Sequence, residues 1–95
     1  MTAPEKTVRL RITGEVQGVG YRIWATRTAA GLGLRGWVRN RKDGSVEVLA
    51  TGSSEVIASF VEACRQGPRA AQVTGVSVAE AQGDSGPGFT PLPTA

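Results

Sequence analysis

A glycine-rich segment followed by an arginine is the part of the sequence best suited to chemistry. Gly14, Gly18 and Gly20 precede Tyr21 and Arg22, and glycines let successive backbone N–H groups turn toward one point. A helix that starts near Tyr21 would add free amide donors and the positive end of its dipole. The planar guanidinium of Arg22 would add a charge and paired donors that match phosphate oxygens. The segment therefore predicts a site for a phosphate-like anion; a plain flexible connection between a strand and a helix is the alternative.

Two well-known phosphate-binding loops have a different spacing. The nucleotide P-loop places lysine directly after its last glycine, and no lysine follows a glycine in this segment. The dinucleotide fingerprint requires G-x-G-x-x-G, whereas Gly18-Val19-Gly20 is followed by Tyr21, Arg22 and Ile23. The segment therefore belongs to neither class of nucleotide-binding loop.

Composition narrows the chemistry further. The 95 residues are enough for one domain with a modest core. The net charge is +3, and nine of the eleven basic residues are arginine. The sequence has no histidine and a single cysteine, Cys64, which excludes histidine-dependent triads, most zinc sites and an internal disulfide. No apolar run marks a secretory peptide or a membrane span. We expect a cytoplasmic monomer that acts on a small anion, with no metal, cofactor, membrane or nucleic acid as a partner.

Hydrophobic periodicity predicts the elements that position these residues. Apolar residues alternate in strands and recur every three or four positions in helices. Ser53 is a suitable N-cap, Asp43-Gly44 a tight turn and Gly67-Pro68 a helix stop. The predicted elements are a strand over 6–13, a helix over 21–32, a strand over 34–40, a returning strand from Val46 to Ala50, a helix after Ser53, and a strand with Val73, Val76 and Val78 and a bulge at Gly75.

The two ends of the chain are predicted to contribute little. Residues 1–5 are short and polar, which indicates a loose start. Residues 83–95 are rich in glycine and proline, so we expect mostly a tail that takes no part in the site. At best, residues 89–92 form a short edge strand, because proline cannot donate to a sheet interior.

The order of these elements predicts the fold. A β-α-β-β-α-β sequence indicates an α+β, ferredoxin-like sandwich, with an antiparallel sheet and two helices on one face. Right-handed crossovers make the first two strands parallel, with another strand between them. The glycine segment and Asn40, at the end of the second strand, then emerge at the same edge of the sheet, roughly 10 Å apart. We therefore expect Asn40 to share the anion site; the alternative is that it only bonds local backbone, as many asparagines before turns do.

These residues resemble the two signatures of the acylphosphatase family. The run from Gly14 to Arg22 is similar to the first signature. The second is matched by Gly36-Trp37-Val38-Arg39-Asn40 together with Gly44-Ser45-Val46 and Gly52. The resemblance covers about residues 7–78, and it implies hydrolysis of acyl phosphates to a carboxylate and inorganic phosphate, without metal or cofactor.

The resemblance also implies roles for individual residues. Arg22 matches the arginine that binds the phosphoryl group, and Asn40 matches the asparagine that orients the attacking water. The phosphate cradle corresponds to the backbone amides of Gln17, Gly18, Val19, Gly20, Tyr21 and Arg22. Two positions depart from the usual pattern: Tyr21 replaces phenylalanine, so its hydroxyl needs a partner, and Arg41 replaces a small hydroxyl residue.

Three other interpretations compete with this one. RNA-binding domains share the sandwich, and Arg35, Trp37 and Arg39 lie on a basic hairpin, but the first strand lacks stacking aromatics at its outward positions. A phosphate-binding relative without turnover would have the same residues. A cysteine phosphatase would need five residues between Cys64 and its arginine, and Arg69 follows after four; we expect Cys64 to be a buried packing residue.

Overall fold

The computed structural model describes residues 4–82 and 86–95. Residues 1–3 of the predicted loose start and residues 83–85 of the predicted tail lie outside this part. The first strand already begins at Glu5, one residue before the predicted boundary. The elements are β1 (Glu5–Glu15), α1 (Tyr21–Gly31), β2 (Arg35–Asn40), β3 (Val46–Ser53), α2 (Ser54–Gln66), β4 (Gln72–Ala81) and β5 (Phe89–Leu92).

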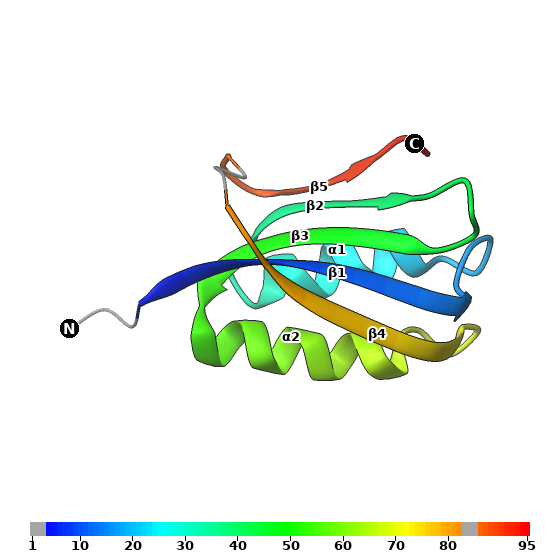
Figure 1. The fold of residues 1–95 in the computed structure, drawn as a ribbon, viewed down its shortest axis with the longest axis horizontal. Helices are drawn as coiled ribbons and strands as arrows, with labels where there is room; N and C mark the ends of the chain where they lie inside the picture. Colours follow the sequence, from blue (N-terminus) through cyan, green and yellow to red (C-terminus); the bar gives the residue numbers. More distant parts are fainter. Residues whose placement is uncertain (1–3, 83–85) are drawn as a thin grey trace.

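The sheet has the predicted topology, with one strand added at its edge. Its order is β4-β1-β3-β2-β5, so β3 lies between β1 and β2 and pairs antiparallel with both. The four predicted strands form an antiparallel sheet, and β5 adds to β2 in parallel. Figure 1 shows that the loop after β1 and the turn between β2 and β3 lie at the same end of the molecule. The α+β ferredoxin-like prediction is therefore confirmed.

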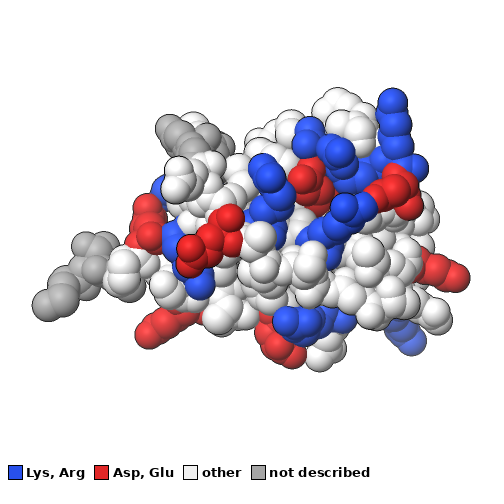
Figure 2. Space-filling view, in the orientation of Figure 1, with Lys and Arg blue, Asp and Glu red and all other residues white. Residues whose placement is uncertain are grey.

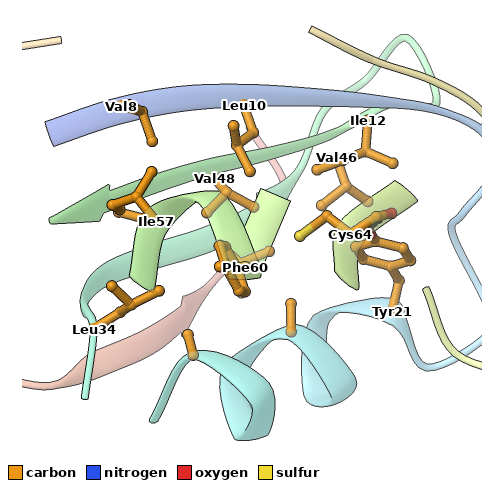
Figure 3. Close-up of a cluster of buried hydrophobic side chains, with 14 of the residues drawn as sticks. Val8, Leu10, Ile12, Tyr21, Leu34, Val46, Val48, Ile57, Phe60 and Cys64 are labelled. Atoms are coloured by element: carbon orange, nitrogen blue, oxygen red, sulfur yellow. Dashed lines mark hydrogen bonds between the residues drawn. The ribbon is translucent and has the colours of Figure 1, made fainter. Parts of the chain in front are cut away.

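The core fills the space between the sheet and the two helices (Figure 3). Buried positions in β1 alternate with exposed ones, as a half-buried strand requires. The central strand β3 has no exposed residue. Burying each large apolar side chain contributes about 1.5–3 kcal/mol. The side chains with almost no exposure include Val8, Leu10, Ile12, Val46, Val48, Ile57, Phe60 and Cys64.

The two helices end near the predicted points. In α2, the Ser53 hydroxyl accepts a hydrogen bond from the Val56 amide, and Gly67 ends the helix with a positive φ of 68°. Helix α1 buries Tyr21, Ala25 and Ala29. Leu32, the last residue of the predicted helix, follows the last helical residue, and its side chain is exposed.

A bulge between β1 and β4 lies where Gly75 predicted it. Thr13 pairs with Gly75, while the next residue, Gly14, pairs with Val73, so Thr74 is the extra residue on β4. Gly14 lies in β1 rather than in the loop after it. A side chain at Gly14 would collide with the backbone of β4 at Gln72, so this glycine is required for strand packing.

The C-terminal residues are more ordered than the predicted tail. β5 is present at the predicted residues 89–92, with Pro91 on an edge strand. Beyond it, the Ala95 amide donates to the Asn40 carbonyl at 3.0 Å, and the Lys42 amide donates to the Ala95 carbonyl at 3.3 Å. The C-terminal residues therefore lie beside β2 up to the turn between β2 and β3.

Neither helix in residues 4–82 and 86–95 has the length and apolar character needed to cross a membrane.

Candidate active site

A small pocket lies where the loop after β1, the start of α1 and the end of β2 meet. Its volume is about 120 Å³, well above the room that one water needs. The structure brings Arg22 and Asn40 together there, as the strand order predicts. The residues that line it are Val16, Gly18, Gly20, Tyr21, Arg22, Ile23 and Asn40.

Two glycines shape the loop at this pocket. Gly18 and Gly20 have positive φ angles of 73° and 81°, which residues with a side chain rarely adopt. A side chain at either position would meet only open space among the described residues. The loop is therefore open above these two glycines, and its backbone can approach a ligand closely. Gln17 and Val19, which were predicted to supply amides, are not among the residues that line this pocket in the described chain.

The N-terminus of α1 opens on the same pocket. Gly20 is its N-cap and provides no side-chain acceptor, and the first turn contains no acidic residue. The first amides of a helix have no partner within the helix, and the helix dipole makes this end positive. Together with the loop, this end of α1 favours an anion.

The Arg22 side chain is held by the C-terminal strand. Its Nη1 donates to the Leu92 carbonyl at 3.0 Å, and the residue is half-buried. The expectation that the C-terminal residues take no part in the site is therefore wrong. No acidic side chain pairs with Arg22 in residues 4–82 and 86–95. A guanidinium has five N–H donors, so most of them stay available to a ligand.

Asn40 contributes a carboxamide to the pocket. Its backbone carbonyl accepts from Ala95, but the part of the chain that the structure describes offers its side chain no hydrogen bond. The alternative that Asn40 only bonds local backbone is not what the structure shows. The side chain is half-buried, which leaves it free to bind a water or a ligand in the pocket.

Gln17 joins the two halves of the site through its side chain. Its Nε2 donates to the carbonyls of Arg41 at 2.7 Å and Ser45 at 2.8 Å. Asp43 stiffens the same turn, because its Oδ1 accepts from both the amide and the hydroxyl of Ser45. The glycine loop is thus fixed to the turn that follows Asn40. The sequence indicated a role only for the backbone of Gln17, since nothing in the residue type shows that its side chain reaches two distant carbonyls.

Tyr21 anchors the start of α1 in the core (Figure 3). Its hydroxyl donates to the Cys64 carbonyl at 2.7 Å, so the departure from phenylalanine has a buried partner. Burial raises the pKa of Tyr21 well above its usual value, and burial raises the pKa of the Cys64 thiol to about 12. Cys64 is fully buried, as expected for a packing residue. A protonated thiol in the core cannot act as a phosphatase nucleophile.

The open face of the sheet carries a separate basic cluster. Glu47 pairs with Arg9, Arg39 and Arg41, and Arg39 also lies over the Trp37 ring at 4.7 Å. Figure 2 shows basic side chains gathered toward the end where the turn between β2 and β3 lies in Figure 1. Since Arg39 covers one face of Trp37, this aromatic is less open to stacking by a base than the sequence suggested.

No cluster of metal-ligating side chains is found within residues 4–82 and 86–95. The residues that line the candidate site provide backbone amides, one guanidinium and one carboxamide.

Comparison with known proteins gives consistent matches. A family model described as Acylphosphatase matches residues 8–91. The acylphosphatase of Rhodospirillum rubrum is 47% identical over 89 residues, covering 94% of this chain and 98% of that protein. The acylphosphatase of Mesorhizobium japonicum is 47% identical over 88 residues, covering 93% and 94%.

Solved structures show the same likeness. An acylphosphatase from Bacillus subtilis matches with a TM-score of 0.85 and 40% identity over 90% of this chain and 97% of that one. One from Coxiella burnetii matches with a TM-score of 0.89 and 32% identity over 93% of each chain. Every residue that lines the pocket lies inside the range matched by the family model.

Proposed function

The chain belongs to the acylphosphatase family and is an acylphosphatase enzyme, and we propose that it acts at the pocket that holds Arg22 and Asn40. The observation that carries this proposal is the convergence of two side chains on one pocket at an uncapped helix N-terminus. They are the Arg22 guanidinium and the Asn40 carboxamide, which has no hydrogen-bond partner within the described part of the chain. The substrate class that the family implies is acyl phosphates, with inorganic phosphate as a product.

Phosphate binding is the first role of the site. We infer that the backbone amides from Gln17 to Arg22, of which those of Gly18, Gly20, Tyr21 and Arg22 belong to residues that line the pocket, bind the phosphoryl oxygens together with the Arg22 guanidinium. The positive φ angles of Gly18 and Gly20 and the open space above them support this role. The bond from Arg22 to the Leu92 carbonyl supports it further, because a guanidinium held in place loses less freedom when it binds a ligand.

Orientation of water is the second role, and we assign it to Asn40. A carboxamide both donates and accepts hydrogen bonds, so it can hold a water in line with the bond to be broken. The position of the Asn40 carboxamide in the pocket supports this assignment. No titrating residue in either signature is an evident acceptor for the proton of the attacking water, so we propose that this proton passes to a phosphoryl oxygen.

The chemistry needs few groups because the substrate is already activated. The leaving group is a carboxylate, whose acid has a pKa of about 4, so no general acid is required. Phosphoryl transfer passes through a loose transition state, and catalysis depends on positioning the water and stabilising the equatorial oxygens. Amide donors, one arginine and one asparagine are sufficient for this task.

We propose that the chain forms one domain, acts as a monomer in the cytoplasm and uses neither a cofactor nor a nucleic-acid partner. The pairing of Glu47 with three arginines supports the last point, since it offsets part of the charge on the open sheet face.

Phosphate release from benzoyl phosphate tests this function. We expect wild-type protein to release phosphate at the same rate with and without a chelator, and inorganic phosphate to inhibit competitively. A phosphate-binding relative without turnover would bind phosphate and release none. Loss of activity with chelator would contradict the mechanism proposed here.

A further inference from the structure

An apolar side chain lies exposed at the rim of the pocket. Ile23 follows Arg22 in the first turn of α1, and 59% of its surface is exposed. It lines the same pocket as Arg22 and Asn40. The other two large apolar residues that are exposed in the described chain, Leu32 and Val78, are less exposed and do not line this pocket.

The direction in which a bound substrate extends follows from the groups around it. The glycine loop and Arg22 account for the phosphate end of an acyl phosphate, so the acyl end must leave through the mouth of the pocket. On the loop side of that mouth, Gly18 and Gly20 present no side chains. Val16 and Tyr21 also line the pocket but are almost fully buried. Ile23 is thus the one exposed apolar side chain among the lining residues of the described chain.

We propose that Ile23 contacts the acyl group of the substrate and makes the enzyme selective for acyl phosphates with an apolar acyl group, such as an aromatic one. This inference rests on the proposed function of the pocket. Removing apolar surface of Ile23 and of the ligand from water together is favourable in proportion to the area covered. The methyl group of acetyl phosphate covers too little of the Ile23 surface to gain binding free energy from this contact.

The selectivity of an Ile23→Ser variant tests the proposal. Benzoyl phosphate and acetyl phosphate share the phosphate end and differ only in the acyl group. We expect Ile23→Ser to raise KM for benzoyl phosphate by roughly tenfold, the low end of the scale for a lost apolar contact. KM for acetyl phosphate, kcat for both substrates and inhibition by inorganic phosphate should stay within about twofold of wild type.

Two further variants serve as controls. Ile23→Leu keeps the apolar surface and should retain the preference for benzoyl phosphate. Leu32→Ser removes an exposed apolar residue near the other end of α1, roughly 14 Å along the helix, and should leave both KM values unchanged.

The outcomes distinguish a failure of the role of Ile23 from a failure of the proposed enzyme function. Equal changes in KM for both substrates, or no change for either, would overturn the role of Ile23 and leave the enzyme's function intact. A wild-type dimer that Ile23→Ser dissociates, seen by sedimentation, would show that a second copy covers this residue and would also overturn it. If wild-type protein hydrolyses neither substrate, the function itself fails.

Discussion

The N-terminus of α2 has a side-chain cap and that of α1 has none. We interpret the first as serving stability and the second as serving function. Helix α2 starts with Ser53, whose hydroxyl accepts from the Val56 amide, and Glu55 lies in its first turn. Helix α1 starts with Gly20, which offers no side-chain cap, and its first turn has no acidic residue. The chain satisfies the N-terminus of α2 internally and leaves that of α1 open beside Arg22. An open helix N-terminus at a loop of glycines is a site for an anion.

Replacing Arg22 removes the charge at the open N-terminus and should have the largest effect. We expect Arg22→Ala to lower kcat/KM by about 100- to 1,000-fold, the scale for removing a donor aimed at developing charge. Arg22→Lys should lose nearly as much, because lysine lacks the bidentate fork. The measurement is phosphate release from benzoyl phosphate, with circular dichroism as a check on folding. Near-normal turnover of Arg22→Lys would show that charge alone suffices.

A carboxylate at Gly20 would make the start of α1 resemble that of α2. Asp and Asn both tolerate a positive φ better than other residues with side chains, and the structure leaves open space there. We expect Gly20→Asp to weaken inhibition by inorganic phosphate about tenfold relative to Gly20→Asn, because like charges a few ångströms apart repel. Equal inhibition of the two variants would mean that the anion binds elsewhere.

Removing the cap of α2 should give the smallest effect on activity. Ser53→Ala loses the hydrogen bond to the Val56 amide, which should cost about 1 kcal/mol of stability and lower Tm by about 4–8 °C. Activity at 25 °C should not change. Ser54→Ala is the matched control, since no side-chain hydrogen bond of Ser54 is present in the described chain. A loss of activity without a change in Tm would contradict the separation between the two helices.

Much of the fold and the meeting of Arg22 with Asn40 could be predicted because they depend on patterns of side chains. Alternating apolar residues set the strands, and the strand order then places the ends of β1 and β2 at one edge. Asn40 could be singled out because its residue type and its position at a strand end both carry information.

The parts that sequence analysis missed depend on backbone atoms. Arg22 donates to the Leu92 carbonyl and Gln17 to the carbonyls of Arg41 and Ser45. Every residue has a carbonyl, so residue type gives no signal for these contacts. The parallel pairing of β5 with β2 is a long-range contact of only four residues that include a proline. For Gly14, the residue type was informative but its role was assigned wrongly. The sequence placed Gly14 in the anion-binding loop, whereas the structure shows that close packing against β4 requires a glycine there.

The separate roles of Arg22 in phosphate binding and of Asn40 in water orientation are tested most directly by Asn40→Ala. Both kcat and inhibition by inorganic phosphate are measured on the same sample. If the open start of α1 and Arg22 bind the phosphate while Asn40 acts only on the water, kcat should fall by about 100-fold, as expected when the attacking group is no longer positioned. The inhibition constant for inorganic phosphate should stay within about threefold. An equal loss of turnover and of phosphate binding would show instead that Asn40 maintains the shape of the site.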